Sequence, residues 1–139
     1  MRQIVYESVA SVEICKSDLD EILVKSISNN TENGLTGVLI QSGQRFIQAL
    51  EGDEPALEKT LRRIAFDPRH HDVKVLFNEE TNSRDFTRSS MMLIGSEPET
   101  QRIQSWFWPK GDIDTTTVSG ADMLEFLKLS SVTHIPVFA

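Results

Sequence analysis

The sequence contains one cysteine, Cys15, and three histidines among its 139 residues. A lone cysteine cannot form an internal disulfide, and no group of cysteine and histidine has the spacing of a zinc site. Cys15 also precedes a helix start with no base beside it, so we expect an inert thiol. His71 and His134 have no carboxylate or cysteine partner in the pattern, and we expect both to be structural.

Basic residues are in the minority. Fourteen lysines and arginines stand against 21 acidic residues, which gives a net charge of −7. This charge argues against general binding to DNA, RNA or an anionic membrane surface.

Long apolar runs are missing too. No stretch approaches the roughly 18 apolar residues that a membrane span needs. The N-terminus runs straight into a strand-like alternation rather than an apolar signal segment. With 39% hydrophobic and 25% charged residues, the composition is that of a globular protein. We therefore expect one cytoplasmic domain.

The apolar pattern predicts five strands and two helices in the first part of the chain. The strands are predicted at residues 3–9, 35–40, 45–52, 73–77 and 89–94, and the helices from Ser17 to Asn30 and from Pro55 to Ala65. Ser17 is a plausible helix cap, and Asp67-Pro68 ends the second helix. The order β-α-β-β-α-β-β predicts an α+β fold, a ferredoxin-like mixed sheet with both helices on one face.

The chain changes character near Gly95. Residues 96–118 are polar apart from the aromatic segment Trp106–Pro109, and residues 119–129 have the spacing of a short helix with Met123, Leu124, Phe126 and Leu127 on its apolar side. We expect residues 1–95 to form the main unit. Residues 96–139 would be a helical extension of the same domain that covers the other sheet face.

Three polar side chains point toward the predicted core. Alternation places Gln48 on the same sheet face as Phe46 and Leu50, and Tyr6 and Asn30 likewise face apolar neighbours. A buried carboxamide that stays unpaired costs on the order of 1–3 kcal/mol. Gln48 therefore needs a partner, which could be a side chain, a water or a bound ring, unless it lies at a sheet edge and faces water.

Four segments resemble the BLUF domains, blue-light sensors that use flavin. They are Ile4–Ser8; Ser28–Asn30 followed by Gly34–Leu39; Arg45–Gly52; and Ile64–His70. The spacings from Tyr6 to Asn30 and from Tyr6 to Gln48 also fit the family. The resemblance covers roughly residues 3–94.

The resemblance implies a noncovalent FAD whose ring lies between the two helices. Ile22 and Ile64 would sandwich the ring, Asn30 would hold a flavin carbonyl and ring nitrogen, and Gln48 would bridge Tyr6 and the flavin edge. The remaining implied neighbours are Arg63 and Asp67, beside the ribityl and phosphate portion, with Asn29, Arg69 and His70 next to them.

The resemblance also implies a mechanism without substrate turnover, so the chain would not be an enzyme. Tyr6 would give an electron and a proton to the excited flavin, and Gln48 would rotate or tautomerise, which shifts absorption to the red. Met91 matches the family's methionine on the fifth strand. That strand and the C-terminal helices would carry the signal to a downstream protein, since no cyclase, phosphodiesterase or DNA-binding signal is present.

One position departs from the family pattern. Ser89 stands where the family usually has tryptophan, and Trp106 or Trp108 could fill the space, although a core or interface role suits them better. Homo-oligomers are common among short family members, and Trp106–Pro109 is a candidate contact surface. Arg84 could fix the turn before the fifth strand.

Two other functions stay open. Asn30 and Arg63 are also the residue types of an acylphosphatase-like enzyme, but a phosphate-binding glycine loop is missing. A light-insensitive interaction module with the same fold is the other alternative.

Overall fold

The computed structural model describes residues 1–87, 90–95 and 97–132, which include five strands and four helices. In chain order these are β1 (Arg2–Ala10), α1 (Lys16–Asn33), β2 (Thr36–Ser42), β3 (Arg45–Gly52), α2 (Glu54–Ala65), β4 (His70–Glu80), β5 (Met92–Ile94), α3 (Pro98–Phe107) and α4 (Gly120–Val132). His134 and Ser89 lie outside the described residues.

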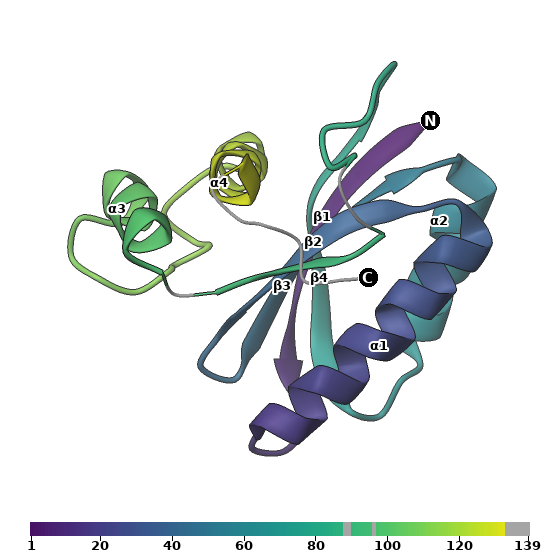
Figure 1. Ribbon diagram of the computed structural model, residues 1–139, viewed down its shortest axis with the longest axis horizontal. Helices are drawn as coiled ribbons and strands as arrows, with labels where there is room; N and C mark the ends of the chain where they lie inside the picture. Colours follow the sequence, from purple (N-terminus) through teal and green to yellow (C-terminus); the bar gives the residue numbers. More distant parts are fainter. Residues whose placement is uncertain (88–89, 96, 133–139) are drawn as a thin grey trace.

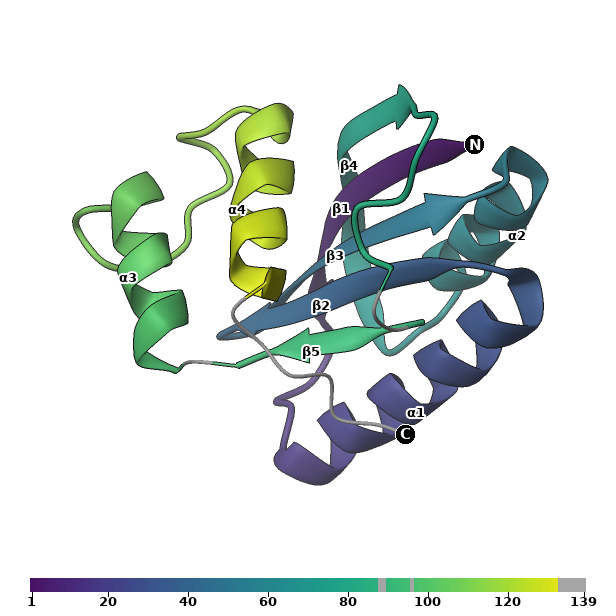
Figure 2. The same ribbon diagram turned by 45° about the horizontal axis from the view of Figure 1, so that its top comes forward.

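The strands form one mixed sheet in the order β4-β1-β3-β2-β5. β3 is antiparallel to both β1 and β2, β4 is antiparallel to β1, and β5 runs parallel to β2. Helices α1 and α2 lie on one face, and α3 and α4 lie beyond the other (Figures 1 and 2). The predicted ferredoxin-like arrangement with an added fifth strand is confirmed.

Helix α1 begins earlier than predicted. Its N-cap is Cys15 rather than Ser17, and the Asp18 carboxylate accepts a hydrogen bond from the Cys15 backbone N–H at 3.1 Å. At the other end Gly34 has a φ of 68°, the left-handed conformation that glycine adopts without strain. This tight end lets the chain turn directly into β2.

Helix α2 follows the predicted pattern with one exception. Pro55 lies in its first turn, and Leu57 is fully buried. The helical spacing of Leu57, Leu61 and Ile64 predicts that Ala65 shares their apolar stripe, but Ala65 is exposed at the end of α2. That part of the prediction is wrong.

The second sheet face is covered as predicted, but by two helices rather than one. α3 lies in the polar segment 96–118, where the apolar spacing predicted no helix, and its buried residues are Thr100 and Ile103. Trp108, just after α3, is 5% exposed and packs edge-to-face on Phe126 of α4, with ring centroids 5.0 Å apart. Trp108 therefore belongs to the core on this face.

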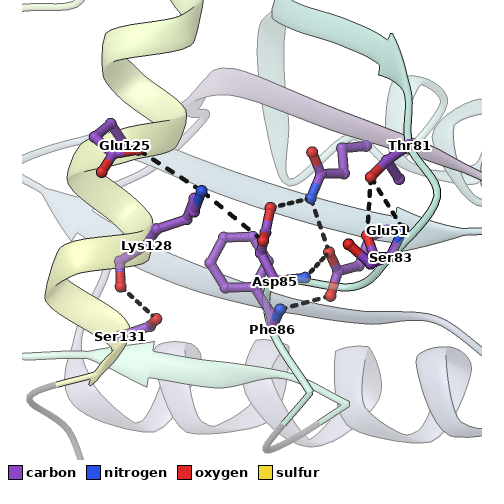
Figure 3. A network of polar contacts seen from close by, with 9 residues as sticks. Glu51, Thr81, Ser83, Asp85, Phe86, Glu125, Lys128 and Ser131 are labelled. Atoms are coloured by element: carbon purple, nitrogen blue, oxygen red, sulfur yellow. Dashed lines mark hydrogen bonds and ion pairs between the residues drawn. The ribbon is translucent and has the colours of Figure 1, made fainter.

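Strand β5 is shorter than predicted, with three residues, and Ser90 and Met91 precede it outside the strand. The connection that leads to it is held by the buried carboxylate of Glu51, at the end of β3 (Figure 3). Glu51 accepts hydrogen bonds from the backbone N–H groups of Asp85 and Phe86 at 2.8 and 2.7 Å, from Gln3 at 3.1 Å and from Thr36 at 2.8 Å.

Arg84 holds the same segment after β4 through hydrogen bonds to the backbone at the ends of α1 and β3. Its guanidinium donates to the backbone carbonyl oxygens of Gly34 and Glu51 at 2.8 and 3.2 Å. The predicted role of Arg84 in the turn before the fifth strand is confirmed. Lys128 of α4 lies 3.8 Å from the Asp85 carboxylate, so this connection also contacts the C-terminal helix.

Replacing Glu51 by glutamine should lower the free energy of unfolding by about 2–4 kcal/mol, because the new amide N–H₂ must face N–H donors inside the protein. Urea denaturation gives the change. Glu58→Gln on the exposed face of α2 is the matched control and should leave the midpoint within experimental error. Equal midpoints for both variants would contradict the structural role of Glu51.

Candidate functional site

A cavity of about 630 Å³ lies between α1, α2 and the sheet face that these helices cover. Pockets of this size hold drug-sized ligands. Its walls come from β1, β2, β3, both helices and the turn after α2. The lining residues are Tyr6, Ser8, Ile22, Lys25, Ser26, Asn29, Asn30, Leu39, Phe46, Gln48, Lys59, Thr60, Arg62, Arg63, Ile64, Phe66, Asp67, Arg69 and His70.

Tyr6 and Gln48 form the polar centre of the sheet wall. They are directly opposite each other in the register of β1 and β3, so their side chains rise from the same face of the sheet. Both are buried, at 3% and 7% exposed, and the Tyr6 hydroxyl donates a hydrogen bond to Gln48 Oε1. Burial raises the pKa of the Tyr6 phenol far above its usual value, so the hydroxyl keeps its proton at neutral pH.

Met91 reaches Gln48 from the far side of β2. Its sulfur lies 3.7 Å from Gln48 Nε2, and its side chain is buried. The structure thus brings the three predicted photoactive residues, Tyr6, Gln48 and Met91, into one chain of contacts. An amide nitrogen carries two hydrogens, so the Met91 contact still leaves Gln48 a donor for a ligand.

Asn30 and Asn29 lie at the last turns of α1. Asn30 is 2% exposed, donates to the backbone carbonyl of Ser90 at 2.8 Å and lines the cavity. Asn29 donates to Thr60 of α2 at 3.2 Å and accepts a hydrogen bond from the Arg63 guanidinium. The Asn29, Thr60 and Arg63 contacts therefore tie the two helices together beside the cavity.

Ile22 and Ile64 both line the cavity, one from each helix, and both are half-buried. Apolar side chains on opposite walls suit a flat aromatic ring that enters between them. The resemblance assigned them this place, and the structure puts them around the same space.

Asp67, Arg69 and His70 form the turn that closes the cavity beyond α2. Arg69 donates to the Asp67 carboxylate through its backbone N–H at 2.9 Å and through its guanidinium, which holds the pKa of Asp67 below its usual value. A ring nitrogen of His70 lies 2.6 Å from the Ile64 carbonyl oxygen. All ten residues assigned to cofactor binding therefore line this one cavity, and their contacts with flavin stay a prediction.

Several lining residues were not singled out as site residues from the sequence. Thr60 is one helical turn before Ile64, and Ser8 is two residues after Tyr6 on the same strand face. Helical spacing from Ile64 and strand alternation from Tyr6 therefore could have predicted that Thr60 and Ser8 line the site. Among the described residues, none forms a hydrogen bond with the buried Ser8 Oγ. A buried hydroxyl without a partner at a cavity wall suits a polar ligand group.

Charge is unevenly distributed around the cavity. Five of its lining residues are cationic, namely Lys25, Lys59, Arg62, Arg63 and Arg69, and Asp67 is the one acidic residue among those that line it. In a chain with a net charge of −7, this concentration favours an anionic ligand. Apolar walls (Ile22 and Ile64), amides that face the cavity (Asn30 and Gln48) and a cationic rim formed by these five lysines and arginines together fit a flavin nucleotide.

Other kinds of site are not found in the part of the chain that the structure describes. No group of three or more metal-ligating side chains gathers there. None of the helices formed by these residues has the length and hydrophobicity to cross a membrane.

The model of the family described as "Sensors of blue-light using FAD", BLUF, matches residues 1–92. The blue light- and temperature-regulated antirepressor BluF of Escherichia coli is 30% identical over 76 residues, which are 55% of this chain and 19% of that protein. The photoactivated adenylate cyclase subunit beta of Euglena gracilis is 35% identical over 68 residues, 49% of this chain and 8% of that protein. The chain thus spans a small part of these relatives' length.

Solved structures agree in fold. The photo-activated state of BlsA superposes with a TM-score of 0.83 at 24% identity, over 99% of both chains. The dark state of BlrB, a BLUF protein, gives 0.76 at 23% identity over 96% of both. A bacterial light-regulated adenylyl cyclase gives 0.70 at 30% identity, over 78% of this chain and 33% of its own.

The residues matched by the family model include the Tyr6–Gln48 pair and all the residues that line the cavity between α1 and α2. The chain belongs to the BLUF family of blue-light sensors that use flavin, whose domains are sensory rather than enzymatic.

Proposed function

We propose that this protein is a blue-light photoreceptor that holds a noncovalent FAD in the cavity between α1 and α2. The buried Tyr6–Gln48 pair at the cavity wall is the observation that carries the proposal. The pair lies at the wall of a ligand-sized cavity, where the family resemblance implies a redox-active phenol and a reorientable amide beside the flavin.

The cavity offers a distinct group for each part of the cofactor. Ile22 and Ile64 would hold the ring, with Asn30 and Gln48 at its polar edge. Arg63, Asp67, Arg69, His70 and Asn29 would lie along the ribityl and phosphate portion. The unpartnered Ser8 Oγ would complete the wall between these two groups.

A bound flavin supplies the absorption of blue light and, when excited, the oxidising power that draws an electron from a phenol. Tyr6 would give up this electron and release its hydroxyl proton toward Gln48 Oε1, the atom to which the hydroxyl already donates. Gln48 would exchange its donor and acceptor ends by rotation or tautomerisation while the electron and the proton return to Tyr6. The changed hydrogen bonding of Gln48 would shift the absorption to the red, and the dark state would return thermally because only hydrogen bonds differ once Tyr6 has recovered its electron and proton.

The output would pass through β5 and the C-terminal helices to an unidentified partner protein, and the chain would form a homo-oligomer. Gln48 contacts Met91 immediately before β5, and the connection before Met91 contacts Lys128 of α4. In this view residues 1–95 form the sensor, and residues 96–139 form the extension that reports its state. Trp106, 63% exposed on α3, offers a contact surface.

A light-insensitive interaction module is the second candidate. The serine at position 89, where the family usually has tryptophan, favours it. Absorption of the purified protein distinguishes the two.

Purified protein supplied with FAD should have a flavin spectrum that shifts to the red under blue light and returns in darkness. Tyr6→Phe and Gln48→Leu should keep the flavin and lose the shift, because each removes one member of the hydrogen-bonded pair. A colourless protein would overturn the photoreceptor proposal. Bound flavin without a shift in the unaltered chain would favour the interaction module.

The red shift should keep its amplitude from about pH 6 to about pH 10, the ordinary pKa of tyrosine. Burial raises the pKa of Tyr6, so the neutral phenol that donates its proton persists where an exposed tyrosine ionises. The contribution of the neutral Tyr6 phenol to the stability of the fold is complete below the ordinary pKa of tyrosine. This contribution is lost as the pH rises through the raised pKa of Tyr6. Tyrosinate absorption measures this directly, because Tyr6 is the chain's single tyrosine, and its titration near pH 10 would contradict the buried site.

Lys128→Met should leave the red shift intact but weaken the light-dependent change in hydrogen exchange of α4. The contact with Asp85 is partly exposed, so the effect should be modest, up to about fivefold in exchange protection. Lys110→Met, at an exposed position between α3 and α4, is the control. The same light-dependent exchange in both variants would exclude Lys128 from the output route.

A further inference from the structure

The turn after α2 places a phenylalanine where solvent meets the cavity. Phe66 is 86% exposed, yet it lines the cavity together with Asp67, Arg69 and His70. It is the C-cap of α2, and Asp67-Pro68 prevents the helix from continuing over it. Single exposed apolar residues are common on proteins, but Phe66 combines exposure with a place at the mouth of a cationic cavity.

The sheet register separates this turn from the Tyr6–Gln48 pair. Tyr6 is opposite Gln48, and Ala10, four residues further along β1, is opposite His70. Four strand residues span about 13 Å at about 3.3 Å each. His70, which follows the turn that carries Phe66, therefore lies about 13 Å along the sheet from the Tyr6–Gln48 pair, within reach of the ribityl and phosphate portion of a flavin whose ring lies beside Gln48.

The charges around the mouth match that portion of the ligand. The cationic residues that line the cavity include Arg62, four residues before Phe66, and Arg69, three residues after it, whose guanidinium also binds the Asp67 carboxylate. Phosphates held by these groups would place whatever follows them near the exposed ring. In FAD the group that follows the diphosphate is adenosine, whose purine has flat faces that stack on aromatic side chains.

We propose that Phe66 is the stacking platform for the adenine of FAD and makes the site prefer FAD over FMN. This inference rests on the proposed function, since it requires a flavin in the cavity. FMN carries the same ring, ribityl chain and a phosphate but lacks adenine. The cationic side chains would thus bind the phosphate of either ligand, whereas Phe66 would stack only on the adenine of FAD.

The test is the affinity of the full chain for FAD, FMN and riboflavin, measured by titration calorimetry in the dark. Phe66→Ala should weaken FAD binding about five- to tenfold, the low end for base–aromatic stacking because only one face is covered. In Phe66→Ala the affinities for FMN and riboflavin should stay within about twofold of those of the unaltered chain. Phe66→Trp, which keeps an aromatic ring at this position, should bind FAD as the unaltered chain does. Trp106→Ala, which removes another exposed aromatic outside the cavity, should change no flavin affinity.

The outcomes separate this inference from the function on which it rests. Unchanged FAD binding in Phe66→Ala would overturn the adenine platform and leave flavin binding intact. Equal losses for FAD and FMN would overturn it too, because Phe66 would then contact a portion that both ligands share. Failure of the unaltered chain to bind any of the three flavins would overturn the proposed function itself. A changed oligomeric state with unchanged affinities would assign Phe66 to a contact between copies and likewise overturn the platform.

Discussion

The site depends on one physical constraint, the need to hydrogen-bond a carboxamide inside a protein core. Gln48 is buried among apolar side chains, and its two ends require different partners, an acceptor for its nitrogen and a donor for its oxygen. Tyr6 satisfies the oxygen and Met91 contacts the nitrogen. Because these partners are chemically different, a change in the amide's orientation alters contacts on both sides at once.

The polar groups around this pair are fixed to different degrees. The carboxylate of Glu51 accepts several hydrogen bonds, two of them from the backbone N–H groups of Asp85 and Phe86 after β4. The cavity wall formed by Ser8 and the rim lysines has fewer internal partners. A binding site needs this combination. The supporting polar groups are hydrogen-bonded within the protein, and the polar groups at the cavity wall are left to bind the ligand.

The sequence predicted those features that depend on short periods. Strand alternation placed Tyr6 and Gln48 each among apolar neighbours on its own strand, and the family resemblance supplied their pairing and ten of the residues that line the cavity. Helix α3 was missed because its apolar side is short, with Ile103 and Phe107 in an otherwise polar segment that packs on α4. The Glu51 contacts could not be predicted, since they join segments far apart in the sequence. The end of α2 was predicted from Asp67-Pro68, but the place of Phe66 at the cavity depends on how α2 packs against α1 and the sheet.

The two faces of the sheet alternate residue by residue along β1 and β3. Val5 and Ile47 pack in the core beneath α4, while their neighbours Tyr6 and Gln48 line the cavity. A deletion of one residue within either strand would exchange these sets, putting the phenol or the amide under α4 and an aliphatic side chain into the cavity. Descendants of this chain can therefore diverge by substitution along β1 and β3, whereas changes in length have to accumulate in the turns.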